Sequence, residues 1–558
     1  MLAYRHPTEV LAEQHETADR GRHLRASDHV PAGKRVLQEE AVSAVLYDEH
    51  VAHRCHMTFS LVQSPLRCGG CKHARYASRE NQRLAWSLGH RQECAALQAC
   101  LPNMPPPTVR LVARLYWRMD RLKAETPARL QVQHSEIDGL EHHWDDLPDS
   151  KKQLYAQMAA LTRRYMQGNQ SDDTDLPDQK SLALMLARCA CNNHTICDDE
   201  LRPIGVGLFP TGALVNHSCT PNAMQSFSQH RIIFTALQPI PAGTEITISY
   251  IELAATRSER RQQLLDQYYF DIDHDLQGGH AESVLQCQSG PESFSAQLCR
   301  SAPGHMDPAD YELTAVQLIS AQTPLQAHLM AFSKTHKKPA EQDSFAYGGS
   351  ADLDEGDDEP ASSGQQAPYG RQRDGEARQD LVHTQCWGQG WQGVSERHLL
   401  AIGHHMLRLL SQHTQCLAAL QSQCPAEAKQ LAEAALQSAD CLPGPARALG
   451  PRHIWRVRLC EALMRACIDV GNLWQEALAV GLQLVPAYEM IYPKVWPNKG
   501  LHFAAMAKIA AFLEHDATAA EYANKALQQL QYTHATSPVL EEIRQIAFQA
   551  SRSQDLLA

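Results

Sequence analysis

The sequence predicts an α+β protein, with a β-rich first half followed by an all-α C-terminal region. Short runs of β-branched and apolar residues, bounded by turn residues, recur in the first half and are typical of strands. From about residue 395 onward, the chain instead shows the apolar periodicity of helices. Residues 51–100 interrupt the first half with cysteines and histidines at the spacing of metal ligands.

Strands are expected near the N-terminus and again after residue 200. The turn-rich segment 26–34 precedes two apolar runs of strand length at 36–37 and 42–46. Further predicted strands cover residues 204–209, 232–236 and 245–250, the last two separated by a Pro-Ile-Pro-Ala-Gly-Thr turn.

Helices are expected between and after these strands. Residues 108–122 place apolar side chains at helical spacing within a helical stretch of about 107–190. A second helix is predicted over 256–267, because Thr256 followed by Glu259 forms a capping box ahead of an apolar face.

The C-terminal region reads as a series of paired helices. Small residues recur at intervals of three or four, which allows helices to pack closely and suggests a tetratricopeptide-like array. The predicted helices cover 395–422, 425–439, 451–470, 474–490, 499–514, 516–532 and 537–553.

An acidic segment precedes these helices. Between Glu341 and Tyr369 there are eight acidic and no basic residues, with many Gly, Ser, Pro and Gln. Such a composition buries too little apolar surface to offset the entropy of ordering, so a disordered insertion is predicted. Its expected role is solvation, with a docking or regulatory site as the alternative.

Composition excludes several classes of function. Lys and Arg total 51 and Asp and Glu 63 among the 558 residues, which gives a formal net charge of −12. Direct nucleic-acid binding is therefore not expected, because it depends on neutralising phosphates with basic residues. No export signal or membrane span is expected, since the N-terminus lacks an apolar core and no apolar run reaches about 18 residues. We expect a cytoplasmic or nuclear protein whose 17 cysteines are reduced.

The most specific motif is Asn-His-Ser-Cys-Thr-Pro-Asn at 216–222, followed by Glu-Ile-Thr-Ile-Ser-Tyr at 245–250. This pair resembles the core of the SET-domain lysine methyltransferases, and most strongly that of the SET and MYND domain (SMYD) family. The matching segments stand in the family's order and extend over nearly the whole chain apart from the acidic insertion. Beyond the core, the matching segments are 20–26, 140–143, 191–196, 256–270, Tyr492-Pro493 and 532–538.

The resemblance implies a β-rich SET core split by a MYND-type zinc module and a helical insert, followed by an all-α tetratricopeptide-like domain. The implied parts are 1–50 (N-terminal part of SET), 51–100 (degenerate MYND finger), 101–195 (helical insert), 196–253 (core SET), 254–280 (post-SET region), 281–394 (partly disordered acidic insertion or linker) and 395–558 (helical domain).

The implied function is protein-lysine N-methyltransferase with S-adenosylmethionine as cofactor and a lysine-containing protein or peptide, histone or not, as substrate. Methyl transfer needs a neutral amine, although free lysine has a pKa near 10.4, and an aromatic channel that excludes water favours the neutral form. Tyr250 matches the family's channel tyrosine, to which we assign orientation and electrostatic help. The implied cofactor-binding residues are Arg20, Arg22, His143, Asn192, Asn216, His217, Tyr268 and Phe270.

The cysteine cluster resembles a MYND finger, a module with two interleaved zinc sites. Cys68, Cys71, His90 and Cys94 fall at the positions of one complete site, and three thiols with one imidazole suit tetrahedral Zn²⁺. Three residues separate Trp86 and His90, where two are usual in the family. The alternative is two buried thiols beside a surface histidine.

Other parts of the family pattern are missing. The second MYND site keeps Cys55, but Thr58, Ala77 and Asn81 stand at its other positions, so one zinc ion per chain is predicted. The post-SET site is also lost, with Ile272, His274 and Gln277 at ligand positions and Cys219 as the remaining ligand. The post-SET lid is therefore expected to be held by packing alone. His23 stands where the family has a cofactor-loop glycine.

Two other functions compete with the enzyme. The first is a catalytically decayed adaptor that acts through protein–protein contacts, as the lost zinc ligands suggest. The second, a zinc-finger DNA binder, is disfavoured by the acidic charge. Whether the protein is an enzyme or an adaptor, its helical domain is expected to contact protein partners. The protein is expected to be a monomer.

Overall fold

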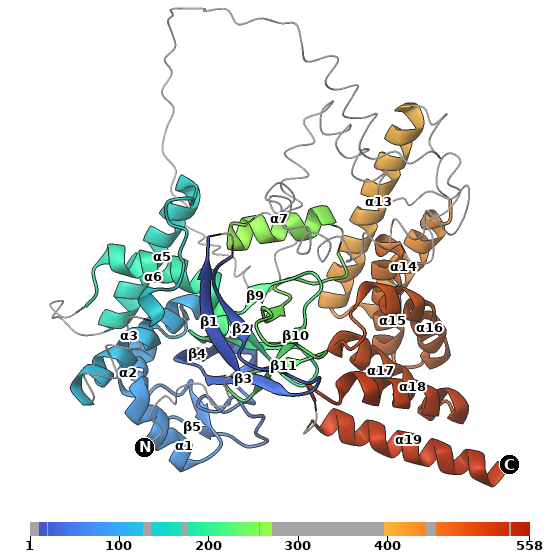
Figure 1. Cartoon of the computed structure of the whole chain (residues 1–558), viewed down its shortest axis with the longest axis horizontal. Helices are drawn as coiled ribbons and strands as arrows, with labels where there is room; N and C mark the ends of the chain where they lie inside the picture. Colours follow the sequence, from blue (N-terminus) through green and yellow to red (C-terminus); the bar gives the residue numbers. More distant parts are fainter. Residues whose placement is uncertain are drawn as a thin grey trace, which may run out of the picture.

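The computed structural model describes residues 11–270, apart from 19, 126–135, 169–175 and 256, and residues 396–557, apart from 442–452 and 535–536. The acidic insertion predicted over 281–394 and the capping residue Thr256 therefore lie outside the described residues. In Figure 1 the sheets stand at the centre, with one group of helices on each side.

Small sheets form the centre of the first half, as the α+β prediction requires. They have the strand orders β1-β2, β10-β11-β3, β4-β8-β7 and β12-β9. The strands are β1 (Ala12–Thr17), β2 (Gly21–Ala26), β3 (Arg35–Glu40), β4 (Ser43–Leu46), β7 (Asn193–Cys197), β8 (Pro203–Leu208), β9 (Asn216–His217), β10 (Ala223–Ser228), β11 (Arg231–Ala236) and β12 (Thr247–Ile248).

Most of the predicted strands are confirmed, but the one over 245–250 is shorter. Only Thr247–Ile248 forms a strand, and it pairs in parallel with β9. Glu245 makes an isolated bridge to Arg25 instead. After β12 the chain no longer pairs with β9, and this change of course places Tyr250 at the candidate site.

The finger and the helical insert cover one side of these sheets. The finger contains β5 (Leu66–Arg67), β6 (Arg75–Tyr76), α1 (Arg79–Ala85), the π-helical turn η2 (Trp86–His90) and α2 (Arg91–Cys100). The insert contains α3 (Pro107–Glu125), α5 (Asp149–Gln167) and α6 (Gln179–Asn192). One apolar core joins finger, insert and sheet, because Cys94, Leu111, Leu186 and Val45 belong to the same buried cluster.

Helix α7 (Arg257–Tyr268) begins beside the C-terminal helices and ends beside the insert helix α5, and its Leu264 is fully buried, as the sequence predicts. The C-terminal region is helical throughout its described part, with helix bounds within a few residues of those predicted. The helices are α13 (Glu396–Gln421), α14 (Pro425–Ala439), α15 (Ile454–Val470), α16 (Trp474–Ile491), α17 (Pro497–Phe512), α18 (Asp516–Leu530) and α19 (Pro538–Leu557). Among the described helices, none combines the length and apolarity that crossing a bilayer requires.

Specific contacts fix the C-terminal helices to the SET-like half. Arg458 donates two hydrogen bonds of 2.8 Å to the carboxylate of Glu259 on α7. The hydroxyl of Tyr492 donates to Glu252 across 3.0 Å. Gly33, at φ +80°, lies against Tyr532, whose ring would be 2.5 Å from an added Cβ. The close approach at this turn therefore requires glycine.

Glu461 makes the stability of this helical domain depend on pH. Burial raises the pKa of its carboxyl from 4.5 to about 7, against the hydrogen bond from Tyr488 and with help from nearby Glu252. The stability that the retained proton contributes is present below pH 4.5 and is lost as pH rises through 7. As the pH rises from 5 to 8, we expect the free energy of unfolding of Glu461→Gln to increase by about 1–3 kcal/mol relative to that of the wild type. Urea unfolding at both pH values measures this, and the exposed Glu489→Gln should show no such gain.

Candidate active site and metal centre

Strands β9 and β12 place two predicted site segments side by side. His217 lies opposite Ile248 in the parallel pair, so the chain that follows β12 passes close to the His217 ring. The backbone N–H of Tyr250 donates to Nδ1 of His217 across 3.0 Å. At its other end, the Tyr250 hydroxyl donates to the carbonyl of Val215 across 2.7 Å. Tyr250 is therefore fixed at both ends against the Asn-His segment.

Four rings from three segments meet at this point. The Tyr250 ring lies 4.6 Å from Tyr268 and 5.5 Å from His217, and His217 lies 6.0 Å from Phe270. Burial raises the pKa of both tyrosines above the ordinary value of 10, so each keeps its hydroxyl proton at neutral pH. The result is an aromatic wall that is partly buried at Tyr250 and open at Phe270, which is 37% exposed.

A polar group borders this wall. Arg20 pairs with Glu245 at 3.2 Å, and the Asn216 amide donates to the same carboxylate across 2.9 Å and to the Arg20 carbonyl across 3.1 Å. The Asn222 side chain holds the segment in place, since it donates to the Glu245 carbonyl at 2.8 Å and accepts from the Thr247 N–H at 2.9 Å. The two asparagines of the motif thus organise the backbone on both sides of the candidate site.

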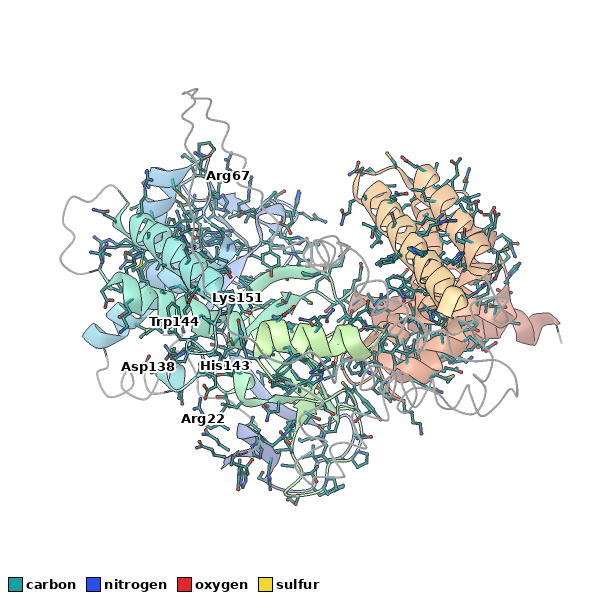
Figure 2. All side chains as sticks on the ribbon, turned by 90° about the horizontal axis from the view of Figure 1, so that it is seen from above. Arg22, Arg67, Asp138, His143, Trp144 and Lys151 are labelled. Carbon is teal, nitrogen blue, oxygen red and sulfur yellow. The ribbon has the colours of Figure 1, made fainter. Side chains whose placement is uncertain are left out.

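The other predicted cofactor residues lie beside a neighbouring loop, 139–146. Arg22 donates to the Gly139 carbonyl, and the Asn192 side chain donates to the Glu141 carbonyl across 2.7 Å. His143 lies in the loop itself, with φ +47°. Figure 2 shows Arg22 and His143 along the same side of the molecule, close to one end of α7. The structure therefore brings the predicted residues together as two adjoining groups.

The end of α7 is held by polar contacts, whereas the lid positions Ile272, His274 and Gln277, for which packing alone is expected, lie outside the described residues. Lys151 on α5 donates to the Asp266 carbonyl at 2.6 Å and to the Tyr269 hydroxyl at 2.8 Å. Its ammonium lies 4.9 Å from the centre of the Tyr269 ring, and the His143 ring lies 5.1 Å from the same ring. Because Tyr269 stands between Tyr268 and Phe270, this clasp fixes both wall residues.

Removal of the clasp should loosen the end of α7. We expect Lys151→Met to speed amide hydrogen exchange over residues 264–270 about tenfold, because hydrogen bonds from a charged donor are worth more than neutral ones. Exchange followed by mass spectrometry measures this. Lys152→Met, which alters the neighbouring amine, is the matched control, and equal exchange in both variants would contradict the clasp.

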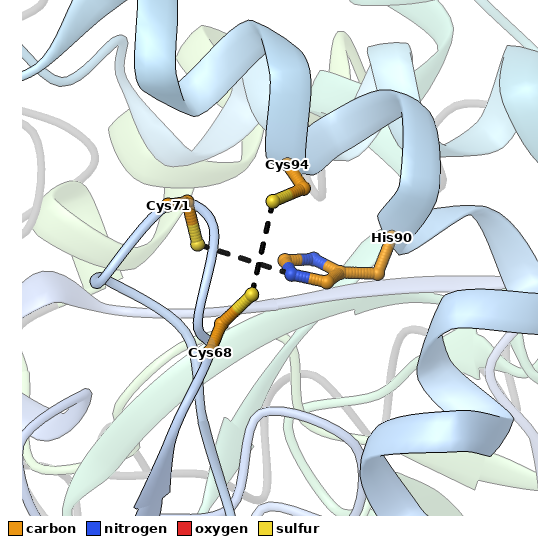
Figure 3. A group of neighbouring side chains, drawn as sticks. All are labelled: Cys68, Cys71, His90 and Cys94. Atoms are coloured by element: carbon orange, nitrogen blue, oxygen red, sulfur yellow. Dashed lines mark hydrogen bonds between the residues drawn. The ribbon is translucent and has the colours of Figure 1, made fainter.

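The predicted metal ligands form one buried cluster. Ligand atoms of Cys68, Cys71, His90 and Cys94 all lie within 4.8 Å of one another. The Cys68 and Cys94 sulfurs are 3.7 Å apart, and the Cys71 sulfur is 3.9 Å from Nε2 of His90 (Figure 3). Tetrahedral zinc with Zn–S bonds of about 2.3 Å spaces its sulfurs by about 3.8 Å. The donor set and its spacing therefore fit zinc.

The thiols favour a bound cation for electrostatic reasons as well. In the absence of a metal ion, burial opposes ionisation of Cys68, but hydrogen bonds from a doubly protonated His90 ring and from backbone N–H groups lower the pKa of this thiol to about 7. Burial and the neighbouring Cys71 charge raise the pKa of Cys94 to about 12. Adjacent thiolates are thus unfavourable without a cation, and the coordinated metal would supply that charge.

The extra residue before His90 does not displace this ligand. It is accommodated in the π-helical turn η2, where Gly89 adopts φ +127°. Gly70 has a matching role on the other side, because a Cβ there would lie 2.7 Å from the Cys94 sulfur. Both glycines allow the thiols and the imidazole to converge.

The remnants of the other predicted sites have become ordinary buried contacts. Cys55 is fully buried and accepts a long contact of 3.8 Å from the Asn81 amide. Cys219 lies 3.4 Å from Nε2 of His217. Within the described part of the chain, the only other group of metal-binding type is His56, His90 and Glu93. His23 is buried and contacts the Gly21 carbonyl and Arg25.

Sequence reasoning missed Glu245, Lys151 and Glu93 as members of these sites. Glu245 opens the second half of the core motif, so its position was a usable signal. Lys151 and Glu93 carry no such signal, because both act through contacts with elements distant in sequence. Glu93 does lie three residues after His90, which places both on one face of a helix.

The region that holds this site is similar in sequence to known proteins. Residues 21–251 match the family model described as SET domain. The chain is 34% identical to mouse "Histone-lysine N-methyltransferase SMYD3" over 264 residues, which cover 47% of this chain and 60% of that protein. It is 35% identical to zebrafish "N-lysine methyltransferase SMYD2-A" over 256 residues, or 46% and 57% of the two chains. The match to mouse "Histone-lysine N-methyltransferase Smyd1" is weaker, 28%, but covers 72% of that relative.

Proposed function

Because the chain belongs to the SET and MYND domain (SMYD) family, we propose that it is an S-adenosylmethionine-dependent protein-lysine N-methyltransferase. The convergence of Asn216, His217, Tyr250 and Tyr268 at one point carries this proposal. The chain spans about 60% of the length of the first relatives that it matches, and its activity and substrate are therefore proposals.

The residues of the site fit the proposed cofactor by their chemistry. The Asn216 amide, the His217 carbonyl and the Arg20 carbonyl offer polar partners for an amino-acid head group. Aromatic faces at Tyr268 and Phe270 suit a sulfonium cation and a flat base. Arg22, His143 and Asn192 adjoin this group and complete the proposed binding surface. When bound, the cofactor supplies a methyl group activated by its positive sulfur.

The chain's own residues would prepare the substrate amine. The ring wall excludes water from a lysine side chain, which lowers the cost of losing its proton and aligns the amine for in-line attack. Tyr250 contributes a neutral hydroxyl that is fixed against Val215 and keeps its orientation through the reaction. Since its proton is donated to Val215, the hydroxyl presents its oxygen lone pairs in a fixed direction, and a fixed dipole of this kind costs no reorganisation when charge changes nearby.

The C-terminal helices have a proposed part as well. Arg458, Tyr492 and His534 fix them to the SET-like half, so they would hold a protein substrate or partner at a defined position relative to the ring wall. Whether histones or other proteins are methylated is decided by the assay below.

The test uses the full chain. Purified protein is incubated with methyl-labelled S-adenosylmethionine and either core histones or a fractionated cell extract, and labelled lysines are mapped by mass spectrometry. Calorimetry with the cofactor is run in parallel. We expect labelled lysine and saturable cofactor binding. The absence of transfer to every fraction would overturn the proposal, and the absence of binding heat as well would favour the decayed adaptor.

A further inference from the structure

Glu93 occupies an unusual place for a carboxylate, inside the finger and against a metal ligand. Its side chain is 3% exposed, and that of His90 is 2% exposed. Nδ1 of His90 donates to Glu93 Oε2 across 2.8 Å, while Nε2 of the same ring faces the Cys71 sulfur. A carboxylate accepts only, so this hydrogen bond places the imidazole proton on Nδ1. The lone pair of Nε2 is then directed at the cysteine cluster.

The second oxygen of Glu93 leads out of the finger. Arg114 on α3 donates from Nε to Glu93 Oε1 across 2.5 Å, and its side chain is 16% exposed. Another nitrogen of the same guanidinium donates to the carbonyl of Ala44 on β4. The chain of contacts therefore runs from the cluster through His90, Glu93 and Arg114 to the backbone of the central sheet. Four separate parts of the fold meet along it.

Hydrophobic packing does not explain a carboxylate at this position. A buried carboxylate is costly unless it is paired and hydrogen-bonded, and Glu93 meets this condition through Arg114, His56 and His90. A carboxylate behind a metal-binding imidazole, however, fixes the ring and raises its basicity as a ligand. His90 is the last residue of η2, and Glu93 lies in the first turn of α2. Because the two helical segments are continuous, the spacing of three residues keeps both side chains on one face.

We propose that Glu93 is a positioning residue for the zinc site: it holds His90 in the metal-binding tautomer, and through Arg114 it joins the site to strand β4. The role is independent of methyl transfer. It makes metal affinity depend on a residue that is not itself a ligand, and it makes the stability of the sheet respond to the metal.

The first test measures zinc affinity by competition with a chromophoric chelator. We expect Glu93→Gln, which keeps the shape and removes the charge, to weaken zinc binding about 10–100-fold. Arg114→Lys should weaken it less, because it keeps the charge and loses only the planar fork. The matched control is Glu80→Gln, an exposed carboxylate of the same finger, which should bind as the wild type does. Glu93→Gln within twofold of the wild type would overturn the proposal.

A second measurement uses the wild-type chain, so that it does not depend on the folding of a variant. The protein is loaded with Co²⁺ in place of zinc, and its hyperfine-shifted proton resonances are recorded in H₂O and in D₂O. We expect one shifted imidazole N–H resonance that exchanges slowly with solvent, since the proton is buried and held by Glu93. If that proton is missing or exchanges within seconds, His90 is not held as proposed.

Discussion

Tyr250→Phe is expected to lower the rate of methyl transfer at least about 100-fold while cofactor affinity changes less than about threefold. The substitution removes only the hydroxyl, which donates to the Val215 carbonyl at the centre of the ring wall. The ring itself remains beside Tyr268 and His217, so the cofactor side of the site keeps its packing. The loss should therefore fall on kcat and not on binding.

The control for this experiment is a tyrosine outside the ring wall. Tyr165 in α5 is buried, and its hydroxyl has no hydrogen-bond partner among the described residues. Tyr165→Phe should therefore keep the wild-type rate within about twofold. Single-turnover kinetics with labelled cofactor separate the chemical step from binding. A Tyr250→Phe protein that retains a third of the wild-type rate would remove this residue from the proposed mechanism.

The sequence allowed the helices of the fold to be predicted more accurately than the strands. The bounds of a helix such as 425–439 can be predicted from nearby residues. Pro425 marks its first turn, and a periodic run of small residues marks its extent. The strand over 245–250 was overextended, because Ile246, Ile248 and Tyr250 alternate as in a strand. Two tertiary contacts determine the length of the strand: the bridge between Glu245 and Arg25, and the hydrogen bond from the Tyr250 N–H to His217.

The candidate site divides in the same way. Ligands and ring residues could be predicted because each belongs to a short motif with fixed spacing. The clasp of Lys151 on Tyr269 joins residues 118 positions apart, so no local pattern indicates it. The same holds for Arg114 on Glu93, and for Gly70, whose missing Cβ matters only because Cys94 comes from another element. The supporting residues are therefore visible only in the folded chain.

The metal site gives the largest expected effect on stability. Its four ligands come from two segments, the Cys68–Cys71 turn and the junction of η2 with α2, and each side chain is nearly fully buried. The unfolded chain has no preformed site, so the binding free energy of the metal contributes directly to folding. The cluster lies in the same apolar core as β4 and the insert helices, so its loss is expected to spread beyond the finger.

Cys71→Ser is therefore expected to reduce the zinc content from one per chain to near zero and to destabilise the SET-like half by more than about 3 kcal/mol. The variant leaves His90 without its neighbouring sulfur at 3.9 Å and leaves Cys68 and Cys94, 3.7 Å apart, without the fourth donor of a tetrahedral set. Metal analysis of the purified protein and urea unfolding, with and without a chelator, measure both effects. Cys100→Ser, on the same helix as Cys94 but outside the cluster, should keep both zinc and stability. If a chelator removes zinc from the wild type without lowering its free energy of unfolding, the metal does not stabilise the fold and the prediction is wrong.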